Sequence, residues 1–197
     1  MNAPVNPKEL ELQTVEFKLD GQTIVSYEGE TILKAAKRHG IDIPHLCFKD
    51  GYRPDGNCRA CVVEINGERT LAPSCCRSAT PGMDVKANSE RALKSQKLVL
   101  EMLLSDMPDE GFKWVGDSKE EEQKNQHGEL STWAARMDVT VRPELKALRR
   151  EKVSNDVSHP AMAVNLDACI QCNRCVRACR EEQVNDVIGY AMRGAHS

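Results

Sequence analysis

The nine cysteines of this 197-residue chain constrain its fold more than any other feature. Eight of them form two runs, spaced C-x10-C-x2-C-x13-C in the first half and C-x2-C-x2-C-x3-C near the C-terminus. Aromatic residues make up only 4% of the chain, so its cores lack the large rings that usually dominate burial. Small cores of this kind are often stabilised by a metal or by disulfides. The cysteines are therefore the first candidates for a functional site.

Charge and hydropathy exclude several classes of protein. A net charge of −3 gives no indication that nucleic acid or an anionic membrane is a partner. The chain has no run of 18 apolar residues, which excludes a membrane-spanning helix and membrane insertion. Residues 1–13 are polar, unlike a signal peptide, and we expect them to form a disordered tail. These observations predict a cytoplasmic chain, whose reduced thiols favour metal ligation over disulfides.

The first run predicts a [2Fe–2S] cluster held by Cys47, Cys58, Cys61 and Cys75. Cys58 and Cys61 lie on one tight turn and are close enough to bind one iron, while Cys47 and Cys75 supply the other. A zinc site is the alternative, but zinc ribbons use two C-x2-C pairs, and the second pair here is adjacent. We expect Cys76 not to be a ligand, because neighbouring residues on an extended chain point in opposite directions, and to be buried.

The second run predicts a [4Fe–4S] site at Cys169, Cys172, Cys175 and Cys179. In bacterial ferredoxins with this spacing, the first three cysteines hold one cluster and the fourth binds a second. No later cysteine follows Cys179, and Arg180 stands where these ferredoxins usually have proline. We therefore expect only half of the two-cluster ferredoxin module in this sequence. Either the chain is a fragment or a split subunit, or Cys179 folds back to complete one cluster. A zinc site is disfavoured here, because cysteines at this even spacing do not readily form the tetrahedral arrangement that zinc requires.

The residues around the first run predict an α+β fold, because a hairpin, a helix, the cysteine loop, a second hairpin and a closing strand follow in order. Asp-Gly and Asn-Gly pairs mark the two hairpin turns, and a threonine caps the helix. The expected strands are Val15–Leu19, Gln22–Tyr27, Cys61–Ile65, Glu68–Ala72 and Met83–Ala87, and the expected helices are Ile32–His39 and one running from Asn88 or Ser89 to Ser105.

The rest of the chain predicts helices and loops. Residues 106–129 carry eight acidic residues against three lysines and read as a solvated loop. We expect a helix at 130–137, a basic stretch at 142–152 exposed on a helix face, a linker at 153–159, a strand at 164–166 and a helix at 176–183. The predicted domains are a tail (1–13), a [2Fe–2S] domain (14–87), for which the resemblance described below implies a ferredoxin-like fold, a helical and acidic-loop connection (88–158) and a partial [4Fe–4S] module (159–197).

Two segments around the first run carry a family resemblance. Ile43-Pro44-His45-Leu46-Cys47 and Gly56-Asn57-Cys58-Arg59-Ala60-Cys61 resemble the [2Fe–2S] domain that opens the large iron–sulfur subunits of NADH dehydrogenases, NAD-linked formate dehydrogenases and bidirectional hydrogenases. The resemblance covers about residues 14–105. It implies a β-grasp ferredoxin fold for this part of the chain.

The segment from Pro160 through Cys169 to Ser197 resembles the α-subunit of soluble NAD-dependent molybdenum or tungsten formate dehydrogenases. The resemblance implies a cytosolic complex in which electrons from formate oxidation pass along clusters to a flavin that reduces NAD. Its partners would be flavin/NADH-module subunits and a molybdopterin catalytic subunit or domain. This chain would supply cluster ligands and no catalytic residue.

Other functions stay open from sequence. A bidirectional hydrogenase or an NADH dehydrogenase uses the same cluster domains, and a redox sensor or cluster-based interaction protein is an alternative of another class. A truncated, inactive product is a further alternative. The wider group also carries, between the two runs, a [4Fe–4S] cluster bound by one histidine and three cysteines. Here His127 is present, but residues 106–160 contain no cysteine, so we expect a scaffold or a docking surface there.

Overall fold

The computed structural model describes residues 13–108 and 128–192. It divides into two compact units, residues 1–43 with 61–93 and residues 44–60 with 94–197. The tail before residue 13, most of the acidic segment with His127, and the closing residues 193–197 lie outside the described residues. Within the described parts, no helix has the length and hydropathy needed to cross a membrane. The predicted domain boundaries remain predictions.

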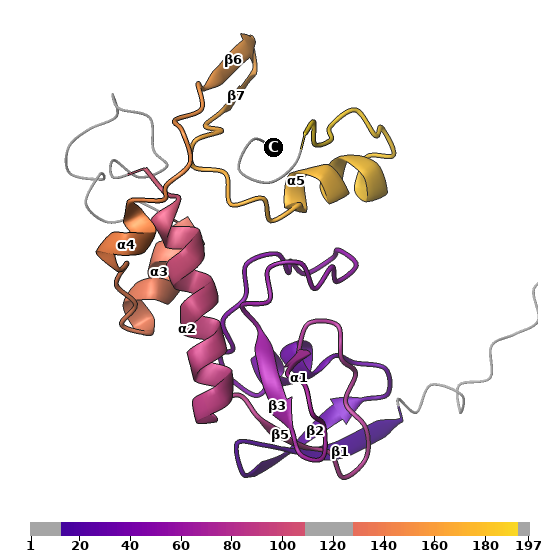
Figure 1. The fold of residues 1–197 in the computed structure, drawn as a ribbon. Helices are drawn as coiled ribbons and strands as arrows, with labels where there is room; N and C mark the ends of the chain where they lie inside the picture. Colours follow the sequence, from indigo (N-terminus) through magenta and orange to yellow (C-terminus); the bar gives the residue numbers. More distant parts are fainter. Residues whose placement is uncertain (1–12, 109–127, 193–197) are drawn as a thin grey trace, which may run out of the picture. The chain divides into compact units, whose positions relative to one another are not determined.

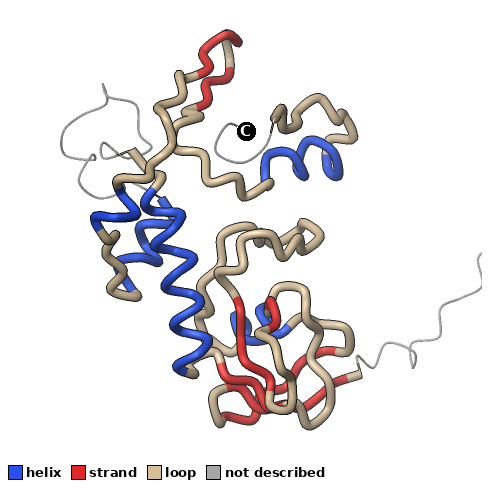
Figure 2. Tube along the Cα trace, viewed as in Figure 1, coloured by secondary structure: helices blue, strands red, loops and turns tan. Residues whose placement is uncertain are grey.

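The first unit is a five-stranded mixed sheet with one helix packed against it (Figures 1 and 2). The strand order is β2-β1-β5-β3-β4, and β1 and β5 run parallel while the other pairs are antiparallel. This confirms the α+β fold class with a ferredoxin-like domain. The elements are β1 (Thr14–Leu19), β2 (Gln22–Tyr27), α1 (Ile32–Arg38), β3 (Val62–Ile65), β4 (Ala72–Pro73) and β5 (Asp84–Lys86).

Local chemistry explains the first hairpin and the helix. Asp20 and Gly21 have φ of 50° and 82°, the left-handed pair that a two-residue hairpin turn requires. The Asp20 carboxylate also accepts the Ala87 N–H at 2.8 Å, which ties the turn to the end of β5. Thr31 caps α1 by accepting the Lys34 N–H. The first hairpin turn and the first turn of α1 are therefore each held by a side-chain hydrogen bond.

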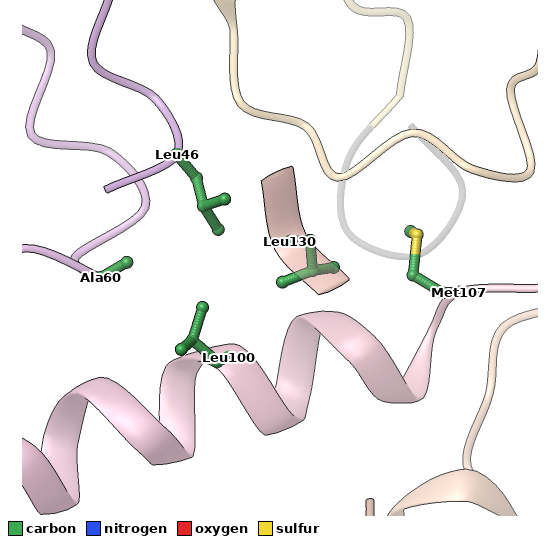
Figure 3. Packing of buried hydrophobic residues seen from close by; sticks show 5 residues of the cluster. All are labelled: Leu46, Ala60, Leu100, Met107 and Leu130. Carbon is green, nitrogen blue, oxygen red and sulfur yellow. The ribbon is translucent and has the colours of Figure 1, made fainter. Parts of the chain in front are cut away.

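The second unit is built around the loop of residues 44–60 and a set of short helices. Leu46 and Ala60 of this loop are fully buried and face Leu100, with Leu130 beside them (Figure 3). Met107, just after the long helix, completes this cluster. The elements are α2 (Glu90–Ser105, which begins in the first unit), α3 (Gly128–Arg136), α4 (Pro143–Lys146), β6 (Asp156–His159), β7 (Met162–Val164), α5 (Arg174–Arg177) and a π-helical turn, η2 (Ala178–Glu182).

Several predicted elements differ from the structure. The strand expected at 164–166 lies at Met162–Val164 as β7. The return strand after Asn66-Gly67 is only the two residues of β4, and Glu68 instead forms an ion pair with Arg77. The expected linker at 153–159 contains β6, which pairs with β7. All four residues of β6 are exposed, so no alternation of apolar residues signals the strand. The last helix begins at 174 rather than 176, and it widens into the π-helical turn.

An ion pair joins α2 to the start of α4. Arg142 donates to the Glu101 carboxylate from its backbone N–H at 3.0 Å, from Nε at 2.8 Å and from Nη2 at 3.2 Å. These bonds lower the pKa of Glu101 from its ordinary value of 4.5. Because the folded pKa lies below the unfolded one, the pair stabilises the fold above about pH 4.5, and this contribution is lost as the pH falls through the folded pKa.

We therefore expect Glu101→Gln to reduce the stability of the chain at neutral pH and to have little effect in acid. Denaturant unfolding at about pH 7 and about pH 3 would measure both values. Replacement of the exposed Glu151 by glutamine is the matched control and should change neither. An equal loss for Glu101→Gln at both pH values would show that the carboxylate charge is not the cause.

Candidate metal centre

Cys47 and Cys58 are neighbours in the second unit. Cys47 is fully buried, and its backbone N–H donates to Sγ of Cys58 at 3.5 Å. The hydrogen bond with the Cys47 thiol raises the pKa of Cys58, and burial and the charge of Cys47 raise it further. The N–H groups of Cys47 and Ala60 act in the opposite direction by donating to the Cys58 sulfur. The loop thus points amide donors at sulfur, as iron–sulfur sites do.

Cys61 and Cys75 lie in the first unit, and Ser74 ties them together. The Cys61 carbonyl accepts the Ser74 N–H at 3.1 Å and the Ser74 hydroxyl at 2.7 Å, and both cysteines are buried. Cys76 is exposed, so the prediction that it is buried is wrong. Its N–H bonds the Pro73 carbonyl at 3.0 Å, and this turn leaves its side chain outside, with Sγ 3.6 Å from Sγ of Cys75.

The first three cysteines of the second run lie close to one another. Burial raises the pKa of the Cys172 thiol, and the charges of Cys175 and Cys169 add to that rise. The N–H of Gln171 donates to Sγ of Cys169 at 3.4 Å, and the N–H of Arg174 donates to the Cys172 sulfur. The left-handed backbone at Gln171 (φ 53°) directs its amide toward sulfur. This segment resembles the first run in presenting amide donors to thiols.

Cys179 has surroundings of its own. It is buried in the π-helical turn η2, and its sulfur accepts the Val187 N–H at 3.4 Å. Its carbonyl accepts the Asn185 N–H at 3.1 Å, so the chain after the turn folds back over this residue. Both roles predicted for Cys179, as a ligand of a second cluster or as the fourth ligand of the first, remain predictions.

The donor set fits iron–sulfur chemistry. All nine cysteines are thiols rather than disulfides, and amide N–H groups donate to Cys58, Cys169, Cys172 and Cys179. Within the described residues, no three His, Cys, Asp or Glu side chains converge so that they would hold a single metal ion. In a cluster the thiolates bind different irons, so the ligands need not meet at one point.

Two arginines of the basic stretch hold the second run in place. Arg149 forms an ion pair with the buried Asp167 at 2.6 Å. The Arg150 guanidinium donates to the carbonyls of Leu166, Asp167 and Cys169 at 3.2, 2.9 and 2.9 Å. The expectation that this stretch is an exposed helix face is therefore wrong for these residues. Their side chains instead bind Asp167 and the backbone carbonyls of residues 166–169, which need hydrogen-bond donors.

Residues 171–177, which lie between the cysteines of the second run, form hydrogen bonds with the loop that carries Cys47 and Cys58. Both partners belong to the second unit, so the contact lies within one compact unit. Sequence reasoning missed these residues, although two arginines one helical turn apart inside a cysteine run were a visible signal. The bonds are Arg174 to the Leu46 carbonyl at 2.6 Å, Arg177 to the Cys47 and Arg53 carbonyls, Asn57 to the Gln171 carbonyl at 3.0 Å and Asn173 to Asp55 at 3.2 Å.

Comparison with known proteins identifies the family of the first run. The sequence profile of the "2Fe-2S iron-sulfur cluster binding domain" matches residues 13–90. The NADP-reducing hydrogenase subunit HndD of Solidesulfovibrio fructosivorans is 37% identical over 93% of this chain and 30% of its own length. The mitochondrial NADH-ubiquinone oxidoreductase 78 kDa subunit of Candida albicans is 32% identical over 90% of this chain and 23% of its own. The chain thus spans under a third of either curated relative.

A solved structure matches over a larger share of both chains. A chain in the crystal structure of NAD+-reducing [NiFe]-hydrogenase in the H2-reduced state superposes with a TM-score of 0.74 and is 30% identical. The match covers 92% of this chain and 72% of that one. The chain therefore belongs to the same family as that chain of the NAD+-reducing [NiFe]-hydrogenase structure, and its residues 13–90 form a 2Fe-2S iron–sulfur cluster binding domain.

Proposed function

We propose that this chain relays electrons between two iron–sulfur sites. Cys47, Cys58, Cys61 and Cys75 hold a [2Fe–2S] cluster, which supplies one-electron chemistry when bound. The second run, from Cys169 to Cys179, holds all or part of a [4Fe–4S] site. The observation that carries the relay is the set of hydrogen bonds between residues 171–177 and the loop of residues 44–60, because it fixes the second run against the backbone that carries Cys47 and Cys58.

We propose that the relay works in a hydrogenase or NADH dehydrogenase type of complex, in the cytoplasm and beside flavin/NADH-module subunits. The names of the relatives support this alternative better than formate dehydrogenase. A formate dehydrogenase complex with a molybdopterin subunit is the second candidate, and it rests on the resemblance of residues 160–197. Affinity purification from the native host separates the two, because the co-purifying catalytic subunit carries either a hydrogenase or NADH dehydrogenase centre or a molybdopterin.

Iron and acid-labile sulfide in the anaerobically purified chain test the proposal. A [2Fe–2S] cluster alone gives about two iron and two sulfide per chain, and both clusters together give about six of each. Low-temperature electron paramagnetic resonance after reduction should show one [2Fe–2S] signal, with a second, faster-relaxing signal when the [4Fe–4S] site is complete. Zinc in place of iron would contradict the electron-transfer function, and stable signalling partners on a monomeric chain would favour the sensor alternative.

A further inference from the structure

Arg177 of α5 is a buried cation in contact with the backbone of a proposed cluster ligand. Its side chain is only 4% exposed. Nη2 donates to the carbonyl of Cys47 and Nη1 to the carbonyl of Arg53. Among the described residues, the nearest acid is Asp55, whose carboxylate lies 3.9 Å from Nε, and the ring of Tyr52 lies 5.9 Å from Cζ. All of these residues belong to the second unit.

The positive charge of this guanidinium is only partly compensated. A distance of 3.9 Å to Asp55 is too long for a hydrogen bond, and among the described residues Nε has no hydrogen-bond partner. A buried charge acts at short range through a low dielectric, so its effect on neighbouring groups is large. Reduction adds one negative charge to a cluster. A fixed positive charge beside a ligand therefore favours the reduced form.

We propose that Arg177 is a positioning residue that raises the reduction potential of the cluster bound by Cys47. It acts in two ways: its hydrogen bond orients the Cys47 carbonyl, and its charge stabilises the reduced cluster. Since Arg177 lies on the same short helix as Cys175, it also makes the potential of the first site depend on the folding of the second run. The inference rests on the proposed function and names how that same site is tuned.

The test is a redox titration of the anaerobic full chain, followed by the [2Fe–2S] paramagnetic resonance signal. Arg177→Met should lower the ratio of reduced to oxidised cluster at least tenfold at a fixed potential, which for one electron is about 59 mV. Asp55→Asn removes the partial compensation and should raise the potential. Arg180→Met is the matched control, because Arg180 lies one turn away with a 58% exposed side chain, paired with Asp186. It should shift the ratio less than about twofold, because solvent screens an exposed charge.

Arg177→Lys separates the effect of the charge from that of the hydrogen bonds. Lysine keeps the positive charge but lacks the planar guanidinium that donates to two carbonyls. The potential of this variant should lie closer to the wild type than that of Arg177→Met, with a broadened signal. A fully loaded Arg177→Met protein with the wild-type potential would overturn the inference. If that variant binds no cluster, an unchanged potential in Asp55→Asn overturns it instead. Wild-type protein without iron would overturn the proposed function as well, so the two failures are distinguishable.

Discussion

Replacing Cys58 by serine is expected to remove the [2Fe–2S] cluster, with a loss of about two iron and two sulfide per chain. Cys58 lies beside the buried Cys47, and the N–H groups of Cys47 and Ala60 donate to its sulfur, as amide groups do to the cysteine sulfurs of iron–sulfur sites. A serine hydroxyl stays protonated at neutral pH and is a far weaker ligand for iron. Iron and sulfide analysis together with the visible absorption of the cluster would measure the loss.

Cys76→Ser is the matched control, because Cys76 is an exposed thiol beside the ligand Cys75. We expect it to keep full iron content and an unchanged spectrum. If Cys76→Ser lost as much iron as Cys58→Ser, the ligand set of the first run would be wrong at its last position. Full iron content in Cys58→Ser would contradict the assignment of the C-x2-C pair.

Leu100→Ala is expected to destabilise the chain by about 2–5 kcal/mol, the usual cost of a cavity at a fully buried leucine. Leu100 is the residue of α2 that faces Leu46 and Ala60 of the cysteine loop and lies near Leu130 of α3 (Figure 3). Cys58 packs against the same cluster, so loss of this side chain should also loosen a proposed ligand. Denaturant unfolding gives the change in free energy, and iron content reports the effect on the site.

Leu98→Ala provides the control on the same helix. Leu98 is 44% exposed, so its truncation should cost less than about 0.5 kcal/mol and leave iron binding unchanged. Equal destabilisation by the two substitutions would mean that helix propensity, rather than packing against the loop, dominates. A stable Leu100→Ala protein would contradict the placement of this core.

The sequence predicts well those features that depend on neighbouring residues. Asp20 and Gly21 form the expected hairpin because their backbone needs positive φ, and Thr31 caps the expected helix because its hydroxyl reaches the Lys34 N–H. The grouping of Cys169, Cys172 and Cys175 also follows from short-range spacing. In each case the information lies within a few residues, so tertiary structure has little to override.

Features that depend on distant residues could not be predicted. The basic stretch predicts that Arg150 is exposed on a helix face, yet Arg150, like Arg177, donates to backbone carbonyls that lie far from it in the sequence. Cys76 was expected to be buried, but the turn at Pro73 places it outside. The strand β6 has no apolar alternation and is defined only by its partner β7. Composition and spacing carry no information on such pairings.

The packing of Leu46 and Ala60 has a consequence for anyone who wishes to make a miniature electron carrier from this chain. The match to the family profile ends at residue 90. The hydrophobic cluster that buries Leu46 and Ala60 also includes Leu100 and Leu130, which lie beyond that residue. A piece cut at the profile boundary would retain Cys47 and Cys58 but expose the apolar underside of the loop that holds them. A fragment that keeps this loop packed must therefore be longer than the segment that matches the profile, and it must extend beyond α3.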